Sequence, residues 1–337
     1  MSDVTQSATL AAPRSVRGQQ WLQHVSLLII MLVLAVFAWL SPIFLTVMNL
    51  GNVLQQTAVV GTLALGLTLV LSGGGLQGIT GGIDLSIAAN LGLSAAVFAS
   101  QLNAGQPIAI ALLLTLLTGA AVGLFNALAI VWLGILPLLA TLTSMNIAIG
   151  LEMVLTSNAS VSASSDLQNL LLSNGPLAVS WLGWSFLLLA FGVIALSRLT
   201  SFGLRLQAVG SHPQAANAAG IGVKRYQGLS YVLCGVSAAI AAIASVSLLS
   251  GSSPGANDNL LMVIAAALLG VVFSRRLVPT LGGALISALF LSLIANGFQL
   301  INVSSYWING VEGVLILLVV ALTALLRRRQ SRRTQGV

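Results

Sequence analysis

Long apolar runs separated by short polar segments limit what this chain can fold into more than any other feature. The run 108–132, for example, contains no charged residue and exceeds the roughly 20 residues that one helical crossing of a bilayer requires. Inside lipid, every backbone N–H and C=O group must be paired within the protein, so such runs fold as helices. Hydrophobic residues make up 57% of the 337-residue chain and charged residues only 6%, which excludes a soluble domain. The sequence therefore predicts an all-α, polytopic membrane protein.

The apolar runs accommodate about ten transmembrane helices with short loops between them. Their approximate ranges are 25–40, 53–71, 84–100, 108–132, 138–155, 177–196, 229–249, 260–273, 281–300 and 307–326. We expect a cytoplasmic tail at 1–23, a transmembrane domain at 24–326 that includes a cytoplasmic loop at 197–227, and a basic cytoplasmic tail at 327–337.

The placement of the basic residues predicts the orientation of the chain. With an even count of about ten crossings and a cytoplasmic N-terminus, all 13 Lys and Arg residues fall on the inner side, as the positive-inside rule requires. The outer segments, around Met48, Asn103, Asp166, Asp258 and Asn302, contain no Lys or Arg. A count of about eight crossings is also even, but it leaves two apolar runs that do not cross. Both termini are expected in the cytoplasm. A net charge of +7 would suit a nucleic-acid partner, but the basic residues lie in flanks and loops, where they set the orientation of the chain, so no nucleic-acid partner is expected.

A polar, glycine-rich segment at 72–86 interrupts the apolar sequence before the third run. Each glycine costs about 1 kcal/mol relative to alanine inside a helix, so the helix is expected to break here and to restart near Asp84. Asp84 is the only acid between Asp3 and Glu152, and a carboxylate at the centre of a membrane helix costs roughly 2.5–3.5 kcal/mol. Irregular backbone at membrane depth persists only where protein buries it or where it lines a watery cavity. The segment is therefore the first candidate for a functional site.

Two structural interpretations of the same segment stay open. Asp84 is also suited to capping the helix that follows it, by accepting a hydrogen bond from the backbone N–H of Ser86 or Ile87. Alternatively, the glycines form only a tight turn between two helices near the cytoplasmic surface. Neither role conflicts with contact between Asp84 and a transported solute.

Four further polar residues lie within apolar runs and are candidates for a substrate pathway together with Asp84. They are Asn126, Thr141, Asn296 and Gln299. Their alternative role is hydrogen bonding between helices, which contributes around 0.6 kcal/mol per bond on average.

The predicted cytoplasmic loop at 197–227 contains basic residues and a second informative segment, at 201–221. Ser211 or His212 fits an N-cap, Pro213 fits the first turn of a helix and Gly220 fits the position just past its end. The pattern predicts a helix of about two turns, which is marginal alone in water, so we expect it to dock on another protein. The alternative is a connecting loop with incidental helicity.

Several of these segments resemble one family of transport proteins. The sequence Gly-Ile-Thr-Gly-Gly-Ile-Asp-Leu-Ser at 78–86 is similar to a signature of the permease subunits of ABC-type sugar importers, the group for ribose, xylose, galactose and autoinducer-2. The segment 208–221 resembles the cytoplasmic coupling segment of that family. Weaker similarities lie at 123–126, 136–142 and 296–307.

The resemblance implies a set of partners and a mechanism. A homodimer, or a heterodimer with a second permease, would sit in the lipid of the bacterial inner membrane above two ATP-binding cassette subunits, and a periplasmic solute-binding protein would deliver the solute. Alternating access would follow from movement of the coupling loop. The coupling residues implied by the resemblance are Gly210, Pro213, Ala215, Ala216, Ala219 and Gly220.

The chain lacks the residues of an enzyme. It contains no Gly-Lys-Ser/Thr phosphate-binding loop, so ATP hydrolysis is expected in a partner chain. His24 and His212 are far apart in the sequence and predict no metal site, and no cofactor is expected. The main alternative function is a proton- or sodium-coupled secondary transporter with Asp84 as the coupling acid, and a structural or channel subunit is a further one.

Overall fold

The computed structural model describes residues 31–74, 82–254, 260–271, 273–274 and 278–303, together with 307, 310, 313 and 314. Its long helices, besides a helix at Met31–Leu40, are α2 (Val47–Gly74), α3 (Ile87–Asn103), α4 (Ile108–Ala127), α5 (Pro137–Thr156), α7 (Trp181–Leu199), α10 (Val223–Leu249), α11 (Leu260–Leu269) and α12 (Leu281–Leu300). The π-helix η2 (Leu128–Trp132) continues α4. The shorter elements are α6 (Asp166–Leu172), η3 (Pro176–Ala178), α8 (Ser201–Ser211), α9 (Pro213–Ala218), β1 (Val161–Ser162) and β2 (Gly251–Ser252).

The described helices confirm a helical, multi-pass membrane protein. Six of them are long and apolar enough to cross a bilayer: Val47–Gly74, Ile108–Trp132, Pro137–Thr156, Trp181–Leu199, Val223–Leu249 and Leu281–Leu300. The count of about ten crossings and the cytoplasmic placement of both termini stay predictions. Residues 75–81 of the glycine-rich segment, most of the tenth apolar run and both tails lie outside the described residues.

The helix boundaries follow local signals in the sequence. α12 matches the predicted run 281–300 because the Thr280 hydroxyl accepts a hydrogen bond from the Gly283 N–H, at 3.2 Å, and caps its first turn. α7 begins at Trp181 rather than near 177, since Ser180 caps it in the same way and the η3 turn precedes it. α2 extends through Gly73 to Gly74, so the first glycines of the interruption are still helical.

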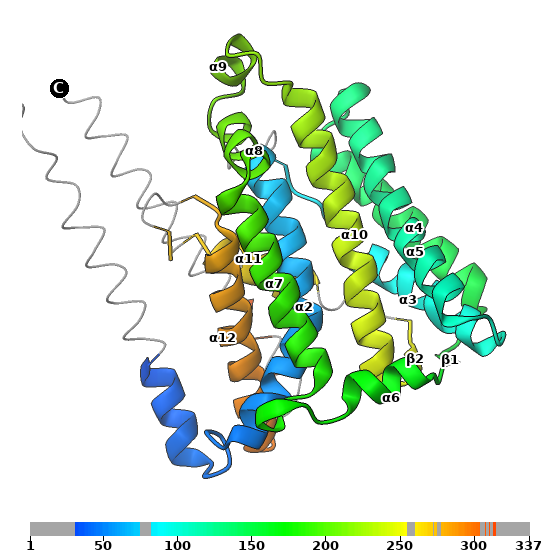
Figure 1. Ribbon diagram of the computed structural model, residues 1–337, viewed down its shortest axis with the longest axis vertical. Helices are drawn as coiled ribbons and strands as arrows, with labels where there is room; N and C mark the ends of the chain where they lie inside the picture. Colours follow the sequence, from blue (N-terminus) through cyan, green and yellow to red (C-terminus); the bar gives the residue numbers. More distant parts are fainter. Residues whose placement is uncertain are drawn as a thin grey trace, which may run out of the picture.

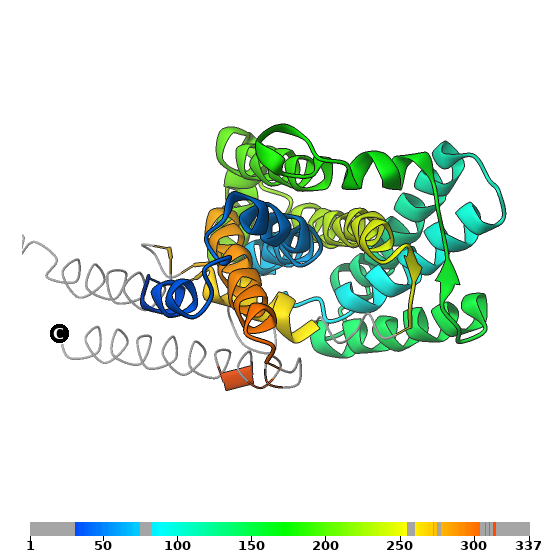
Figure 2. The same ribbon diagram turned by 90° about the horizontal axis from the view of Figure 1, so that it is seen from below.

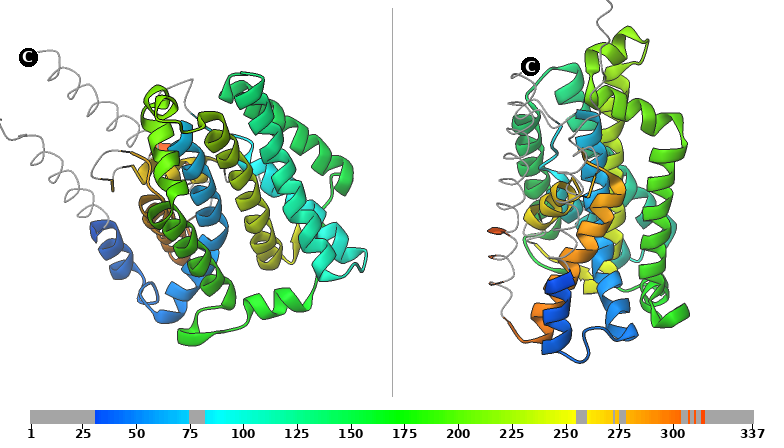
Figure 3. Two further views of the ribbon diagram at one scale, coloured as in Figure 1. Left: turned by 45° about the horizontal axis from the view of Figure 1, so that its top comes forward. Right: turned by 90° about the vertical axis from the view of Figure 1, so that its left-hand side faces the viewer.

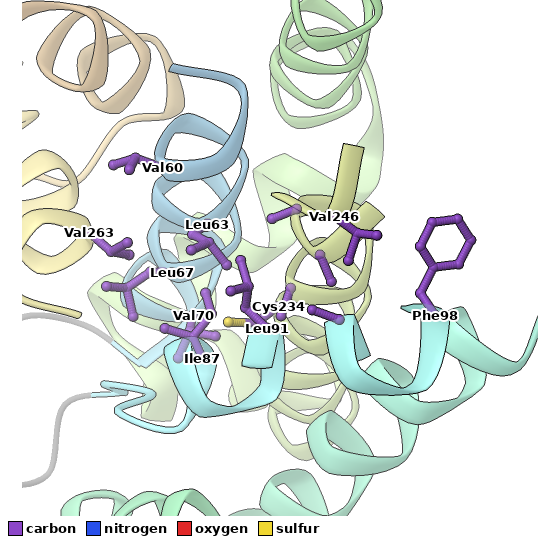
Figure 4. Packing of buried hydrophobic residues seen from close by; sticks show 14 of the residues in the cluster. Val60, Leu63, Leu67, Val70, Ile87, Leu91, Phe98, Cys234, Val246 and Val263 are labelled. Carbon is purple, nitrogen blue, oxygen red and sulfur yellow. The ribbon is translucent and has the colours of Figure 1, made fainter. Parts of the chain in front are cut away.

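α2 and α10 form the centre of the bundle, with α11 and α12 on one side and α3, α4 and α5 on the other (Figures 1 and 2). Figure 4 shows the core that they share, in which Leu63 and Leu67 of α2 meet Leu91 of α3 and Cys234 of α10. α2 is buried on nearly all sides along its second half, because other helices surround it.

α4 and α10 touch through their backbones. A Cβ atom on Gly119 would overlap the Gly235 carbonyl oxygen, and one on Gly123 would lie 2.5 Å from the Tyr231 carbonyl oxygen. Glycine at these positions permits a close approach that any side chain would prevent. Gly119 and Gly123 are therefore helix-packing residues.

The two ends of the bundle differ. At one end, α9 projects beyond the neighbouring helices, and α8 lies beside the end of α2 (Figures 1 and 3). At the other end, β1 and β2 pair in antiparallel fashion, Val161 with Ser252, and α6 packs on α10. The Gln168 side-chain amide of α6 donates a hydrogen bond to the Val246 carbonyl, at 3.2 Å, which holds this end closed over the helices.

Candidate functional site

Asp84 lies just before α3, and only 2% of its surface is exposed. Its Oδ1 atom accepts hydrogen bonds from the Ser86 backbone N–H, at 2.9 Å, and from the Ser86 hydroxyl, at 2.6 Å. The predicted bond from the start of the helix to Asp84 is confirmed, with Ser86 at the N-cap position. The carboxylate therefore fixes the conformation of Ser86, the residue just before the first turn of α3.

Asn126 brings α4 to the same carboxylate. Its Nδ2 atom lies 3.2 Å and 3.3 Å from the two oxygens of Asp84 and 2.8 Å from the Ser86 hydroxyl. The Cys234 side chain of α10 is a further hydrogen-bond partner of Asp84. We call Asp84, Ser86, Asn126 and Cys234 the Asp84 network. It connects three helices, and a hydrogen-bonded buried carboxylate is far less costly than an unpaired one.

The Asp84 network is a structural joint rather than a catalytic arrangement. Its donors leave the carboxylate well satisfied, whereas the Oδ1 atom of Asn126 has no hydrogen-bond partner. No cluster of three or more His, Cys, Asp or Glu side chains within the described residues could hold a metal ion. Contact of Asp84 or Asn126 with a solute stays a prediction.

The other predicted pathway residues lie apart from this network. Asn296 of α12 exchanges two amide hydrogen bonds with Asn49 of α2, at 2.8 Å and 3.2 Å. The Thr141 hydroxyl donates to the Pro137 carbonyl of its own helix, at 2.8 Å, and Gln299 is exposed at the end of α12. Asn296 thus has the bonds between helices that were the alternative to a pathway role, whereas the Thr141 bond stays within α5.

The structure also reveals a polar face that the sequence reasoning missed. Thr143, Asn146 and Gly150 of α5 are exposed and lie three or four positions apart, so they share one face of the helix. Polar side chains within a membrane span face protein or a water-filled cavity rather than lipid. The signal was present in the sequence as this spacing, but nothing there showed which face of α5 is uncovered.

α8, which lies within the predicted cytoplasmic loop 197–227, packs against the end of α2. Leu206 and Val209 of α8 are buried, and a Cβ atom on Gly210 would overlap the Ser72 carbonyl oxygen. The Gln227 side chain of α10 donates to the Gly73 carbonyl of the same turn, at 3.4 Å. Gly210 therefore faces the interior of the protein and touches the turn of α2 that precedes the glycine-rich segment.

α9 is the short helix that the sequence predicted. Pro213 lies in its first turn, His212 is the N-cap and Gly220 has φ +77° just past its end. Pro213, Ala215, Ala219 and Gly220 are exposed, whereas Ala216 is only 5% exposed. A partner can therefore reach most of the predicted coupling residues, but it cannot reach the Ala216 methyl group.

The basic residues within the described ranges gather at the α8–α9 end of the bundle. Arg198 lies in the last turn of α7, Arg205 lies on α8, and Lys224 and Arg225 lie in the first turn of α10. The positive-inside rule assigns such an end to the cytoplasm, which agrees with the orientation predicted from the whole sequence.

Comparison with known proteins identifies relatives along most of the chain. The ribose import permease protein of Escherichia coli (strain K12) is 34% identical over 306 residues, which cover 89% of this chain and 93% of the relative. The galactose/methyl galactoside import permease protein of Salmonella typhimurium (strain LT2) is 29% identical, covering 92% and 97%. The autoinducer 2 import system permease protein of Photorhabdus laumondii is 29% identical, covering 88% of each chain.

A family model agrees with these pairwise similarities. The model described as "branched-chain amino acid transport system / permease component" matches residues 49–320, a range that includes the Asp84 network, the α5 face and the α8–α9 segment. The matched range also contains the segments on which the resemblance to sugar permeases was based, and the chain belongs to this family of permease components.

Proposed function

We propose that this chain is the transmembrane permease subunit of an ATP-driven importer, which moves a small sugar or sugar-like solute across the bacterial inner membrane by alternating access. The observation that carries the proposal is the exposed helix α9 next to α8, which packs on the end of α2. This exposed surface is where a separate ATPase subunit can bind and move the membrane helices. The sugar substrate is inferred from the ribose and galactose permeases among its relatives.

The proposed assembly contains chains that supply what this one lacks. A separate ATP-binding cassette subunit hydrolyses ATP at the α8–α9 end, and a periplasmic solute-binding protein delivers the solute at the end formed by α6, β1 and β2. Apolar side chains exposed on α4 and α7, such as Leu117 and Leu188, contact membrane lipid.

The exposed polar face of α5 suits a pathway between two permease subunits. The Thr143 hydroxyl and the Asn146 amide donate to carbonyls of their own helix, which leaves an oxygen of each to accept a hydrogen bond from a neutral solute, and a Cβ atom on Gly150 would meet nothing within 4 Å. In this proposal the face lines the solute pathway of a permease dimer, either of two identical chains or with a second permease. The partner subunit then shields the polar groups from lipid.

Force from ATP binding follows a short route in this proposal. The ATPase contacts Pro213, Ala215, Ala219 and Gly220, and α8 passes the movement to the end of α2 through Gly210. The glycine-rich segment and Asp84 follow α2 directly in the sequence. Only the end of α2 therefore lies between the α8–α9 segment, where the ATPase docks, and the segment that leads to the start of α3.

The proposal is tested at the exposed side of α9. Ala215→Glu places a charge on the docking surface without entering the core, so ATP-driven uptake and co-purification with the ATPase should both be lost while membrane insertion is unchanged. Ala159→Glu, an exposed alanine beside β1, is the matched control and should keep co-purification. Cysteines at Gln214 and Asn217, both exposed, should cross-link to the ATPase.

The opposing result concerns the energy source. Uptake that is driven by a proton or sodium gradient without ATP, and that Ala215→Glu leaves intact, would overturn the importer in favour of a secondary transporter. Asp84 would then have to be reconsidered as its coupling acid.

A further inference from the structure

A cavity of about 530 Å³ lies between the first half of α7 and the second half of α10. Leu182 and Phe186 of α7 line one side of it, Ile243 and Ala244 of α10 line another, and residues of α2, α4 and α6 complete the wall. All of its lining residues belong to helices that the structure describes. The cavity is therefore bounded by ordered elements.

The packing of α6 and α7 explains why the space stays open. α7 packs on α2, where the Phe186 ring rests against Gly61. α6 crosses the end of the bundle between α10 and α7 (Figure 1), and the Gln168 amide joins α6 to the Val246 carbonyl of α10. The wall between these contacts includes Ala244, whose side chain is too short to fill the gap. The two helices are thus held apart at this depth.

The lining of the cavity is apolar. It contains no charged side chain and no His, Asn or Gln, and its only polar side chains are those of Thr62 and Ser185. The Ser185 hydroxyl donates to the Leu182 carbonyl of its own helix, at 2.8 Å. Water would find few hydrogen bonds in such a space, and an empty cavity forfeits the dispersion contacts of its walls. The lining therefore favours an apolar occupant.

The mouth of the cavity opens on the apolar outer face of α7. Leu188 at its rim is 77% exposed, and Phe191, about one turn further along the same face, is 61% exposed. α4, α7 and α10 are all long and apolar enough to cross a bilayer, so this outer face meets lipid tails, which are as apolar as leucine. The volume of the cavity is comparable with that of one long acyl chain.

We propose that the cavity binds one acyl chain of a membrane lipid, which enters from the bilayer past Leu188 and fills the gap between α7 and α10. A lipid that only coats the surface reaches Leu188 and Phe191. A bound chain also reaches Leu182 and Ala244, which are only 4% and 6% exposed. Because an acyl chain has many rotatable bonds, it keeps the gap filled when α7 shifts. The inference goes beyond the proposed function and depends only on the membrane-spanning helices.

Photo-crosslinking in vesicles tests the site. The purified permease is placed in phosphatidylethanolamine and phosphatidylglycerol with a small fraction of phosphatidylcholine that has a diazirine on one acyl chain. After illumination, mass spectrometry should find crosslinks at Leu182 and Ala244 as well as at Leu188. Ser185→Trp, at an exposed position of the rim, should block the mouth and remove the crosslinks at the two buried positions.

Leu196→Trp is the matched control, because Leu196 is an exposed residue of α7 outside the lining. It should keep the wild-type crosslinks at Leu182 and Ala244. Leu188→Trp blocks the same mouth from a more exposed position and replaces Ser185→Trp if that variant does not insert. In both rim variants, crosslinks at Phe191 should persist, which shows that lipid still surrounds the helix.

Three results would overturn the site. They are crosslinks confined to Leu188 and Phe191 in the wild type, unchanged crosslinks at Ala244 in an inserted rim variant, and a disulfide between two copies of Leu188→Cys, which would assign the mouth to a subunit interface. None of these measurements requires the ATPase, so their failure leaves the proposed function standing. A wild-type complex that does not use ATP for uptake would overturn the proposed function but not the lipid site.

Discussion

Asp84 offers its oxygens to donors from α3, α4 and α10, and every one of those donors is buried. Replacing the carboxylate with an amide keeps an acceptor oxygen for the Ser86 N–H. The new amide NH₂ group would face the Asn126 NH₂ group, but the Asn126 Oδ1 atom has no partner at present. A flip of the Asn126 amide therefore restores a hydrogen bond between the two side chains. The network tolerates the loss of charge better than the loss of acceptors.

We therefore expect Asp84→Asn to insert and transport close to the wild-type level and Asp84→Leu to be destabilised by about 3 kcal/mol or more, because each unsatisfied donor costs about 1–3 kcal/mol. Thermal unfolding of the purified variants and their uptake rates give the comparison. Asp166→Leu, at an exposed acid of α6, is the control and should change stability little. A folded Asp84→Asn variant with no transport would show that the negative charge itself is required.

At the scale of elements, α8 packs closely against the end of α2 at Gly210, although glycine has a low helix propensity. A methyl group at Gly210 would collide with the Ser72 carbonyl oxygen, which is backbone and has no rotamer to change. Gly210→Ala should push α8 off the last turn of α2, so uptake should fall at least tenfold while the ATPase still co-purifies, because α9 keeps its exposed face. Overpacking of this kind costs about 1–3 kcal/mol.

Gly222→Ala is the matched control for that measurement, since the nearest atom to its Cβ would be 3.7 Å away and its φ is −68°. It should transport normally. Equal uptake by the Gly210 and Gly222 variants would show that the α8–α2 contact transmits no movement.

At the scale of the whole molecule, the orientation is open to chemical labelling because the single cysteine, Cys234, is fully buried. Cysteines introduced at Gln214 of α9 and at Asn169 of α6 are both exposed, at opposite ends of the bundle. A membrane-impermeant maleimide should label position 169 in intact cells and position 214 only after the membrane is opened. Labelling of position 214 in intact cells would contradict the cytoplasmic assignment of the α8–α9 end.

The sequence predicted elements well where the signal is local, and poorly where it depends on packing. The run 281–300 and the turn at Pro213 were predictable from hydropathy, caps and prolines. α8 was missed because Gly203 and Gly210 weaken its helical pattern, although both glycines exist for close backbone contact. The pairing of Asn49 with Asn296 spans 247 positions, and no spacing rule connects them. Likewise, the burial of Ala216 and the exposure of Asn146 are properties of the assembled bundle.

Between Gly119 of α4 and Gly235 of α10 no side chain separates the two backbones. Helices that touch in this way have nothing to repack, so a small slide of one along the other brings main-chain atoms into collision. α4 and α10 must therefore travel as one rigid body through the transport cycle, and α3 travels with them because Asn90 donates a hydrogen bond to the Gly119 carbonyl, at 3.2 Å. A side chain does separate α7 from α2, where the Phe186 ring rests on Gly61, so we expect relative movement of helices at boundaries of that kind.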